Sequence, residues 1–170
     1  VSAVLESLAD SGQAATVSRG NAMALSLPDA SVDCIVTDPP YYDSVSYSNL
    51  SDAFYVWLKR SLGPEYPEHF ASELTPKKAE AIMAAYRHQD NKEAASQSYE
   101  GMMLTSLTEA RRVLRSRGLL AIVYAHKTTL GWATLVDALR KAGFVVSEAW
   151  PLTTEMKGGR KKVEKAMLAS

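Results

Sequence analysis

Three short apolar runs divide the chain, and segments with helical periodicity separate them. The runs read VDCIVTD, LLAIVYA and FVVSEAW and occupy residues 32–38, 119–125 and 144–150. The first two show almost no alternation of apolar and polar residues, which is typical of strands covered on both faces, as in a parallel sheet. We therefore expect three buried strands, with a shorter strand-like run before them at residues 14–18.

Helical periodicity occupies most of the remaining chain. In the segment SNLSDAFYVWLKRSLG the apolar residues recur every three or four positions, with Ser51 as the expected N-cap and Gly63 as the C-terminal stop. Another helix is expected to begin near Asn91 and to continue to Gly118. The remaining expected helices cover residues 1–10, 77–88 and 130–143. This alternation of strands and helices predicts an α/β layered fold with a mainly parallel sheet.

The size and composition fit one globular domain. A chain of 170 residues is long enough to bury one core, and 46% hydrophobic with 22% charged residues is ordinary for a folded protein. Residues 64–76 contain three prolines and lie between two expected helices. The region of about residues 48–90 is therefore interpreted as a helical insertion within a single domain that spans residues 1–170.

Charge and cysteine content exclude little but set the expected compartment. Lysine plus arginine and aspartate plus glutamate number 19 each, so composition gives no argument for nucleic-acid binding. No apolar run approaches the roughly 20 residues of a membrane span, and no basic-then-apolar leader opens the sequence. The single cysteine, Cys34, lies in an apolar run and is expected to be a buried thiol in a reducing compartment. We expect a cytoplasmic protein.

The run at residues 32–38 ends in the sequence TDPPYYD, which is an unusual end for a strand. Two adjacent prolines donate no hydrogen bond to a sheet, so the strand must stop there and the chain that follows is stiff. Open α/β sheets bind ligands at the carboxyl ends of their strands. The stretch is therefore expected to lie at a ligand-binding edge.

The residues Asp38, Pro39, Pro40 and Tyr41 match the needs of methyl transfer to a planar amine. The lone pair of such an amine is delocalised into its ring, so the amine is a poor nucleophile. Two acceptors aimed at its hydrogens favour rehybridisation of the nitrogen, which makes the lone pair available. The Asp38 carboxylate supplies one acceptor, and the Pro39 carbonyl, on a backbone with locked φ, supplies the other. Pro40 stiffens the turn, and the Tyr41 ring can stack on a flat base. The alternative is a simple turn followed by packing tyrosines.

The tetrad resembles the amine-methylating motif of methyltransferases that use S-adenosylmethionine and modify the exocyclic amines of bases. The longer run TDPPYYDSVSYSNLSDAFYVWLKRSLG, with GLLAIVYAHKTT downstream, is similar to the large adenine-specific DNA methylases, some of which carry a zinc ribbon. The similarity covers residues 20 to about 155. It implies a three-layer, Rossmann-like α/β sandwich, S-adenosylmethionine as cofactor, and a flipped adenine of double-stranded DNA held by Asp38 and Pro39 and stacked on Tyr41.

The chain departs from that family's pattern in its cofactor motif. The family binds the cofactor through a glycine-rich turn after its first strand, and no such turn appears in these 170 residues. By resemblance the sequence begins near the third strand, so we expect a fold that is incomplete on its amino-terminal side and inactive alone. Asn21 and Asp38 are the expected cofactor contacts, with a strand-ending turn as the alternative for Asn21. By the same resemblance, the partner strand after residue 150 is expected to be missing or unpaired, and an open sheet edge of this kind can lead to self-association.

Further residues are candidates for nucleic-acid contact. A basic cluster near the carboxyl end is expected either to contact DNA phosphates or to be a solvated tail; it contains Lys157, Arg160, Lys161, Lys162 and Lys165. Tyr42 and Tyr47 are expected to stack on bases or to pack against the following helix.

Histidines supply the remaining candidates. His126 and Lys127 follow the strand at residues 119–125, so they are expected at the same sheet edge as Asp38, lining the cleft or facing solvent. His69 and His88 lack neighbouring ligands at metal-binding spacing, so no metal site is predicted.

Other functions remain open from the sequence. The tetrad is shared with enzymes that methylate RNA bases or the amide of a protein glutamine, so the substrate class is less constrained than the reaction. A non-catalytic interaction or regulatory module derived from a methyltransferase is a further alternative, in which the missing glycine-rich turn is a native loss.

Overall fold

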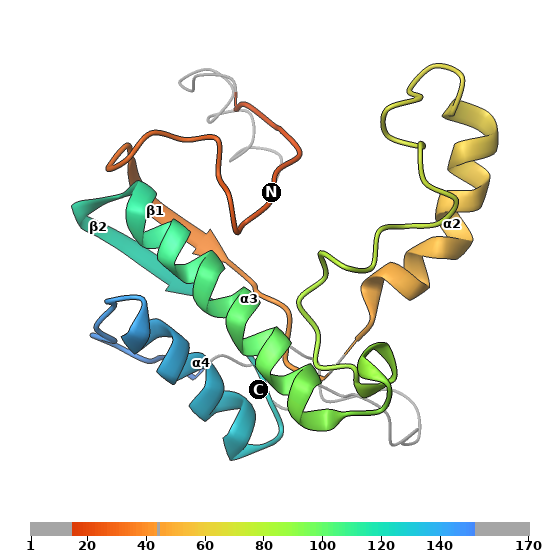
Figure 1. The fold of residues 1–170 in the computed structure, drawn as a ribbon. Coiled ribbons are helices and arrows are strands. Elements are labelled where there is room, and N and C mark those ends of the chain that lie inside the picture. The colour runs from red at the N-terminus through yellow and green to blue at the C-terminus, as the bar shows by residue number, and fades with distance from the viewer. Residues whose placement is uncertain (1–14, 44, 152–170) are drawn as a thin grey trace, which may run out of the picture.

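The structure is a computed structural model that describes residues 15–43 and 45–151. Its elements follow the order β1 (Val32–Thr37), α2 (Tyr47–Leu62), η1 (Ala85–His88), α3 (Lys92–Val113), β2 (Leu114–Ile122) and α4 (Thr129–Lys141). The helix expected at residues 1–10 lies outside the described residues. Figure 1 shows α3 and α4 beside the two strands, while α2 and the following loop extend away from them.

β1 and β2 form a two-stranded parallel sheet. The paired positions run from Cys34 opposite Leu119 to Thr37 opposite Ile122, and the Val123 N–H donates to the Thr37 carbonyl at 2.9 Å. A parallel pair requires a long crossover connection, and here residues 38–113, which include α2 and α3, supply it. The carboxyl ends of the two strands therefore meet at one edge, directly before the motif and before residues 124–126.

Local sequence explains where α3 and α4 begin and end. The Asn91 side chain accepts from the Ala94 N–H at 3.0 Å, and the Thr128 side chain accepts from the Gly131 N–H at 3.4 Å, so each helix has a side-chain N-cap. After α4, Gly143 adopts a left-handed φ of 85°. The Phe144 N–H then donates to the Leu139 carbonyl at 2.9 Å, which completes a glycine C-cap.

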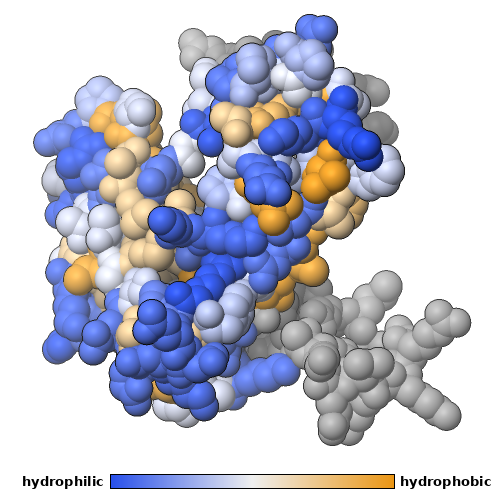
Figure 2. Space-filling view, turned by 45° about the vertical axis from the view of Figure 1, so that its right-hand side comes forward, coloured by the Kyte–Doolittle hydropathy of each residue, from blue (hydrophilic) through white to orange (hydrophobic). Residues whose placement is uncertain are grey.

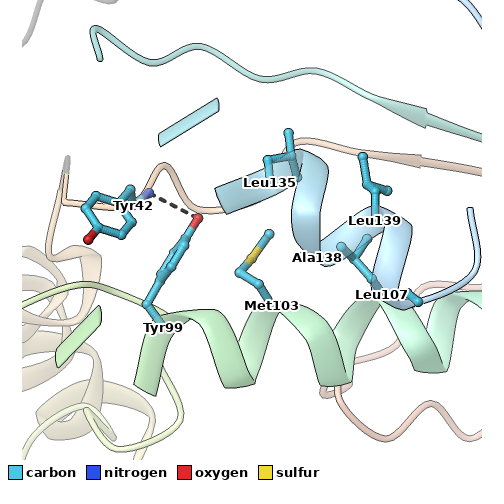
Figure 3. Packing of buried hydrophobic residues seen from close by; sticks show 8 residues of the cluster. Tyr42, Tyr99, Met103, Leu107, Leu135, Ala138 and Leu139 are labelled. Carbon is cyan, nitrogen blue, oxygen red and sulfur yellow. Dashed lines mark hydrogen bonds between the residues drawn. The ribbon is translucent and has the colours of Figure 1, made fainter. Parts of the chain in front are cut away.

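The core lies between the helices and one face of the sheet (Figure 3). Its buried members come from the motif, α3 and α4: Tyr42, Tyr99, Met103, Leu107, Leu135, Ala138, Leu139 and Ala142. Leu120 and Ile122 of β2 pack against this cluster from the sheet. On α3 the buried positions recur at three- and four-residue spacing, as the sequence pattern predicts for an amphipathic helix.

The opposite face of the sheet is exposed. Val36 is 73% exposed and Leu119 is 69% exposed, and Cys34 is exposed beside them. The expectation of a buried Cys34 is therefore wrong, because the described helices cover only one face of the two strands. Apolar residues also reach the surface in patches among polar ones (Figure 2). On α2 these include Leu50, Phe54 and Trp57.

Two expected strands are absent from the described residues. Residues 15–18 are exposed and form no strand, and residues 144–150 run as irregular chain with Val145 and Trp150 exposed. A strand needs a hydrogen-bonded neighbour, and neither segment has one in this part of the protein. Both predictions from the apolar pattern are wrong for this reason.

The expected helix boundaries also need correction. Residues 77–84 are irregular and only Ala85–His88 form a helical turn, of the 3-10 type. The helix expected to reach Gly118 ends at Val113, because β2 begins at Leu114 and pairs with β1. α2 begins at Tyr47 with Ser46 at the N-cap position, so Ser51 is not its cap, whereas Gly63 is the C-cap residue as expected.

Within the described residues, none of the helices combines the length and the apolar character that a membrane span requires.

A carboxylate near the end of α3 anchors the segment before β1. Glu109 accepts from the Leu25 N–H at 2.8 Å and pairs with Arg112, whose guanidinium also donates to the Leu25 and Leu27 carbonyls at 3.1 and 3.0 Å. The Arg112 guanidinium and the Leu25 N–H lower the pKa of Glu109 to about 2. The ionised form of Glu109 is therefore favoured by the fold.

We predict that Glu109→Gln removes part of the acid sensitivity of the fold. Because the folded pKa lies below the usual value of 4.5, the carboxylate stabilises the fold above that pH and loses this contribution as the pH falls toward about 2. Thermal unfolding of both proteins across this range should show a steeper acid decline for the wild type. Glu100→Gln, on the same helix, is the control, and equal slopes for Glu109→Gln and wild type would contradict the prediction.

Candidate active site

The motif lies where the sequence places it, directly after the carboxyl end of β1. Asp38 follows Thr37, the last residue of β1 and the partner of Ile122 on β2. From the neighbouring strand, the His126 Nε2 lies 3.3 Å from an Asp43 carboxylate oxygen. The expectation that His126 and the motif share one sheet edge is confirmed by this contact.

The backbone of the motif is held from α3 by a single hydroxyl group. The Tyr99 hydroxyl donates to the Pro40 carbonyl at 2.7 Å. It also accepts from the Tyr42 N–H at 3.2 Å (Figure 3). On the other side, the Met83 N–H donates to the Tyr42 carbonyl at 2.8 Å. Burial raises the pKa of Tyr99, so its phenol stays a neutral donor. Residues 40–42 are therefore fixed by contacts with two distant parts of the chain.

Tyr42 is a core residue and not an exposed stacking ring. It is 6% exposed, and its ring centroid lies 5.2 Å from that of Tyr99 and 5.9 Å from that of His126. Its hydroxyl is 3.0 Å from the Ser96 Oγ. The expectation that Tyr42 contacts a base is therefore wrong for this conformation, because every part of the side chain is engaged in packing with its own fold.

Tyr41 points to a different environment from Tyr42. Its ring lies edge-on to Tyr124, with centroids 5.1 Å apart and planes at 81°. Burial, followed by the neighbouring Asp38 carboxylate, raises the pKa of Tyr41 to about 12. The phenol is thus neutral at physiological pH, and the residue is only half-buried. Of the two adjacent tyrosines, Tyr41 is the one whose ring can meet a ligand.

The two expected acceptors of the motif are free of the contacts that hold the turn. Asp38 is exposed and Pro39 is half-buried. Within the described part of the chain, the hydrogen bonds at the turn go to the Pro40 and Tyr42 carbonyls and none goes to the Pro39 carbonyl. The carboxylate and this carbonyl can therefore accept hydrogens from a ligand.

His126 supports the edge through packing. Its Nδ1 accepts from the Thr128 N–H at 3.1 Å, and its Nε2 lies 3.3 Å from an Asp43 carboxylate oxygen. Its side chain is 8% exposed, and the ring lies directly against Gly131 of α4. Lys127 is exposed. The histidine thus links the motif to α4 and offers little surface to a ligand.

The other predicted residues lie apart from this group. The Asn21 amide oxygen accepts from the Met23 N–H at 2.9 Å in a turn closed by the Ala24 N–H, which agrees with the turn alternative. Tyr47 is exposed at the start of α2. Lys157, Arg160 and Lys161 lie outside the described residues. Among the residues that are described, no three His, Cys, Asp or Glu side chains group as metal ligands, and His69 instead contacts Arg19.

Tyr99 and Tyr124 were not predicted from the sequence, although both contribute to the site. Tyr99 precedes Met103 by four positions and Leu107 by eight, so it lies on the buried face of α3. A tyrosine on such a face needs a partner for its hydroxyl. That requirement is the one signal the sequence offers, and it does not identify the partner.

The cavity found among the described residues lies away from the motif. A cavity of about 410 Å³ lies between α3 and α4, with Gly101, Leu104 and Ala133 among its lining residues, and not at the edge that carries Asp38. At that edge Asn21 is exposed and its amide oxygen is used in a local turn. Asp38 and the Pro39 carbonyl thus lie at the motif edge, apart from the cavity between α3 and α4.

We predict that Gly131→Ala destabilises the protein by about 1–3 kcal/mol. A Cβ at this position would lie 2.3 Å from the Cγ and Nδ1 atoms of His126, so the imidazole must move away from Asp43. Gly101→Ala is the control, because its Cβ meets no atom within 4 Å and alanine is favoured in a helix. Chemical unfolding of both variants tests this, and equal stabilities would contradict the placement of His126.

Comparison of the chain with protein-family models, with curated proteins and with solved structures found no match.

Proposed function

We propose that the protein takes part in methyl transfer to the exocyclic amine of adenine in DNA, with S-adenosylmethionine as the methyl donor. The observation that carries this proposal is the position of Asp38-Pro39-Pro40-Tyr41 at the carboxyl end of β1 in a parallel pair of strands. Ligands of open α/β sheets bind at this edge. The exposed Asp38 carboxylate, the Pro39 carbonyl and the half-buried ring of Tyr41 support the same function.

For the amine side of the reaction we propose one role for each residue of the motif. The Asp38 carboxylate and the Pro39 carbonyl accept the two hydrogens of the amine, which draws its nitrogen away from planarity and frees its lone pair. When the nitrogen gains a methyl group it must lose one proton, and Asp38 is the acceptor for that proton. Tyr41 lies on the flat face of the base, with Tyr124 fixing the ring from the side.

The rest of the fold, the cofactor side and the DNA contacts must come from other parts of the protein. We propose that β1, β2, α3 and α4 belong to a three-layer, Rossmann-like methyltransferase fold, and that further elements complete its cofactor side. The exposed face at Cys34, Val36 and Leu119 is where a second helical layer would pack. Double-stranded DNA is the proposed partner, with Lys157, Arg160 and Lys161 as phosphate contacts, and the cytoplasm is the proposed compartment.

We predict that Asp38→Ala abolishes methylation while DNA binding survives. Loss of a positioned proton acceptor costs roughly 10²–10⁴-fold in rate, and Asp38→Asn should also be inactive because its amide accepts no proton. The measurement is methyl incorporation into DNA, RNA and protein substrates by the full-length polypeptide, beside a DNA-binding assay. Methylation of RNA or protein in place of DNA would change the proposed substrate class and leave the proposed reaction unchanged.

Asp33→Asn is the matched control for Asp38. It changes an exposed aspartate on the same strand, at the opposite edge of the sheet, where it pairs with Arg115. An exposed ion pair contributes about 0–1 kcal/mol, so this variant should methylate like the wild type. Full turnover by Asp38→Ala would overturn the role of Asp38, whereas no methylation by the wild type would favour a non-catalytic module.

We also predict that the 170-residue chain alone does not bind S-adenosylmethionine at micromolar concentration. The reason is that the 170-residue sequence contains no glycine-rich turn of the kind that holds this cofactor in the proposed family. Isothermal titration calorimetry with S-adenosylmethionine is the measurement, with a longer polypeptide from the same reading frame as the comparison. Clear micromolar binding by the 170-residue chain would show that it holds the cofactor without further elements.

A further inference from the structure

The turn after β1 has a backbone conformation that needs support. Tyr42 has a φ of 36°, in the left-handed region that a bulky residue rarely adopts. For a residue other than glycine this conformation is unfavourable, because the Cβ atom comes too close to the backbone. Such a conformation persists only where the surrounding structure stabilises it, so the contacts at this turn decide its shape.

The Tyr99 hydroxyl is the contact that spans the turn. It bonds to the Pro40 carbonyl at 2.7 Å and to the Tyr42 N–H at 3.2 Å, so one oxygen atom joins the residues on either side of Tyr41. Tyr99 is 1% exposed and lies in the middle of the core, on a helix of 22 residues. The oxygen is therefore held by a rigid element and shielded from water.

The position of the Pro39 carbonyl follows from this contact. The Pro39–Pro40 peptide is planar and the ring of Pro40 fixes φ. Once the Pro40 carbonyl is held by Tyr99, the rotation about ψ of Pro40 is fixed as well. The Pro39 carbonyl then has no free rotation relative to Pro40, and the same contacts fix the backbone that carries the Tyr41 ring.

We infer that Tyr99 is a positioning residue, whose buried hydroxyl holds the Pro39 carbonyl and the Tyr41 ring in their working arrangement; the inference rests on the proposed function. The hydroxyl does not touch the substrate. It acts through the turn, and the amine then meets its two acceptors at a fixed separation. This explains why a buried tyrosine, and not phenylalanine, occupies the position on α3.

The test is Tyr99→Phe, which removes one oxygen atom and keeps the ring. In the full-length polypeptide we expect kcat for DNA methylation to fall roughly 10- to 100-fold because the acceptors lose their alignment, while KM for DNA stays within about three-fold. Hydrogen exchange of the Tyr42 amide, which donates to Tyr99, should become faster. An unchanged kcat with unchanged Tyr42 exchange would overturn the inference.

Tyr55→Phe is the matched control for this variant. Tyr55 is also a buried tyrosine whose hydroxyl donates to a backbone carbonyl, that of Ser72 at 2.8 Å, but it lies on α2 away from the motif. Each variant loses a hydrogen bond of about 1 kcal/mol, so similar losses of stability are expected. If Tyr55→Phe lowers kcat as much as Tyr99→Phe, the effect is one of stability alone and the inference is wrong.

The exchange measurement separates this inference from the proposed function. If the wild-type polypeptide transfers no methyl group, the proposed function fails, and Tyr42 exchange still decides whether Tyr99 holds the turn. If the wild type is active and Tyr99→Phe matches it in kcat, the function stands and the positioning role fails.

Discussion

The parallel pairing of β1 with β2 is the constraint on which the rest of the structure depends. It requires a long crossover, and α3 lies in that crossover with a buried face whose Tyr99 bonds to the motif and whose core cluster packs against Leu120 and Ile122 of β2. It also brings residues 38–43 and 124–126 to one edge, although more than 80 positions separate Asp43 from His126. Without this pairing the motif would be a stiff turn with no neighbours, and neither acceptor would have a defined position.

Sequence patterns predicted β1, the core of β2 and the main helices well because each signal is local. The exposed segments at residues 15–18 and 144–150 show the limit of such signals, since β-type side chains form a strand only beside a hydrogen-bonded neighbour. Cys34 shows the same limit for burial. A continuous apolar run indicates a strand that is suited to cover on two faces, and the described part of the fold provides cover on one.

Some features of the site also follow from local sequence, whereas others depend on contacts between residues far apart in the chain. The position of Asp38 at the end of a strand follows from the prolines beside it, and the proximity of His126 follows from the parallel sheet. The burial of Tyr42 and the role of Tyr99 do not follow from local sequence, because their contacts join residues 57 to 59 positions apart. Two adjacent tyrosines look equivalent in the sequence, and only the left-handed φ of Tyr42 sends one ring into the core and leaves the other at the edge.

Because Tyr99 and the core hold the turn after β1, the two proposed acceptors are fixed in advance of substrate binding. Acceptors that are fixed before the substrate arrives need no reorganisation as charge develops on the amine, and the strained φ of Tyr42 is compensated by core contacts that are distant from the reacting atoms. The amine side can thus be complete within β1, α3 and β2. In the proposed reaction, the methyl donor would then be placed by elements other than β1, α3 and β2, and the two halves of the reaction would depend on separate parts of the fold.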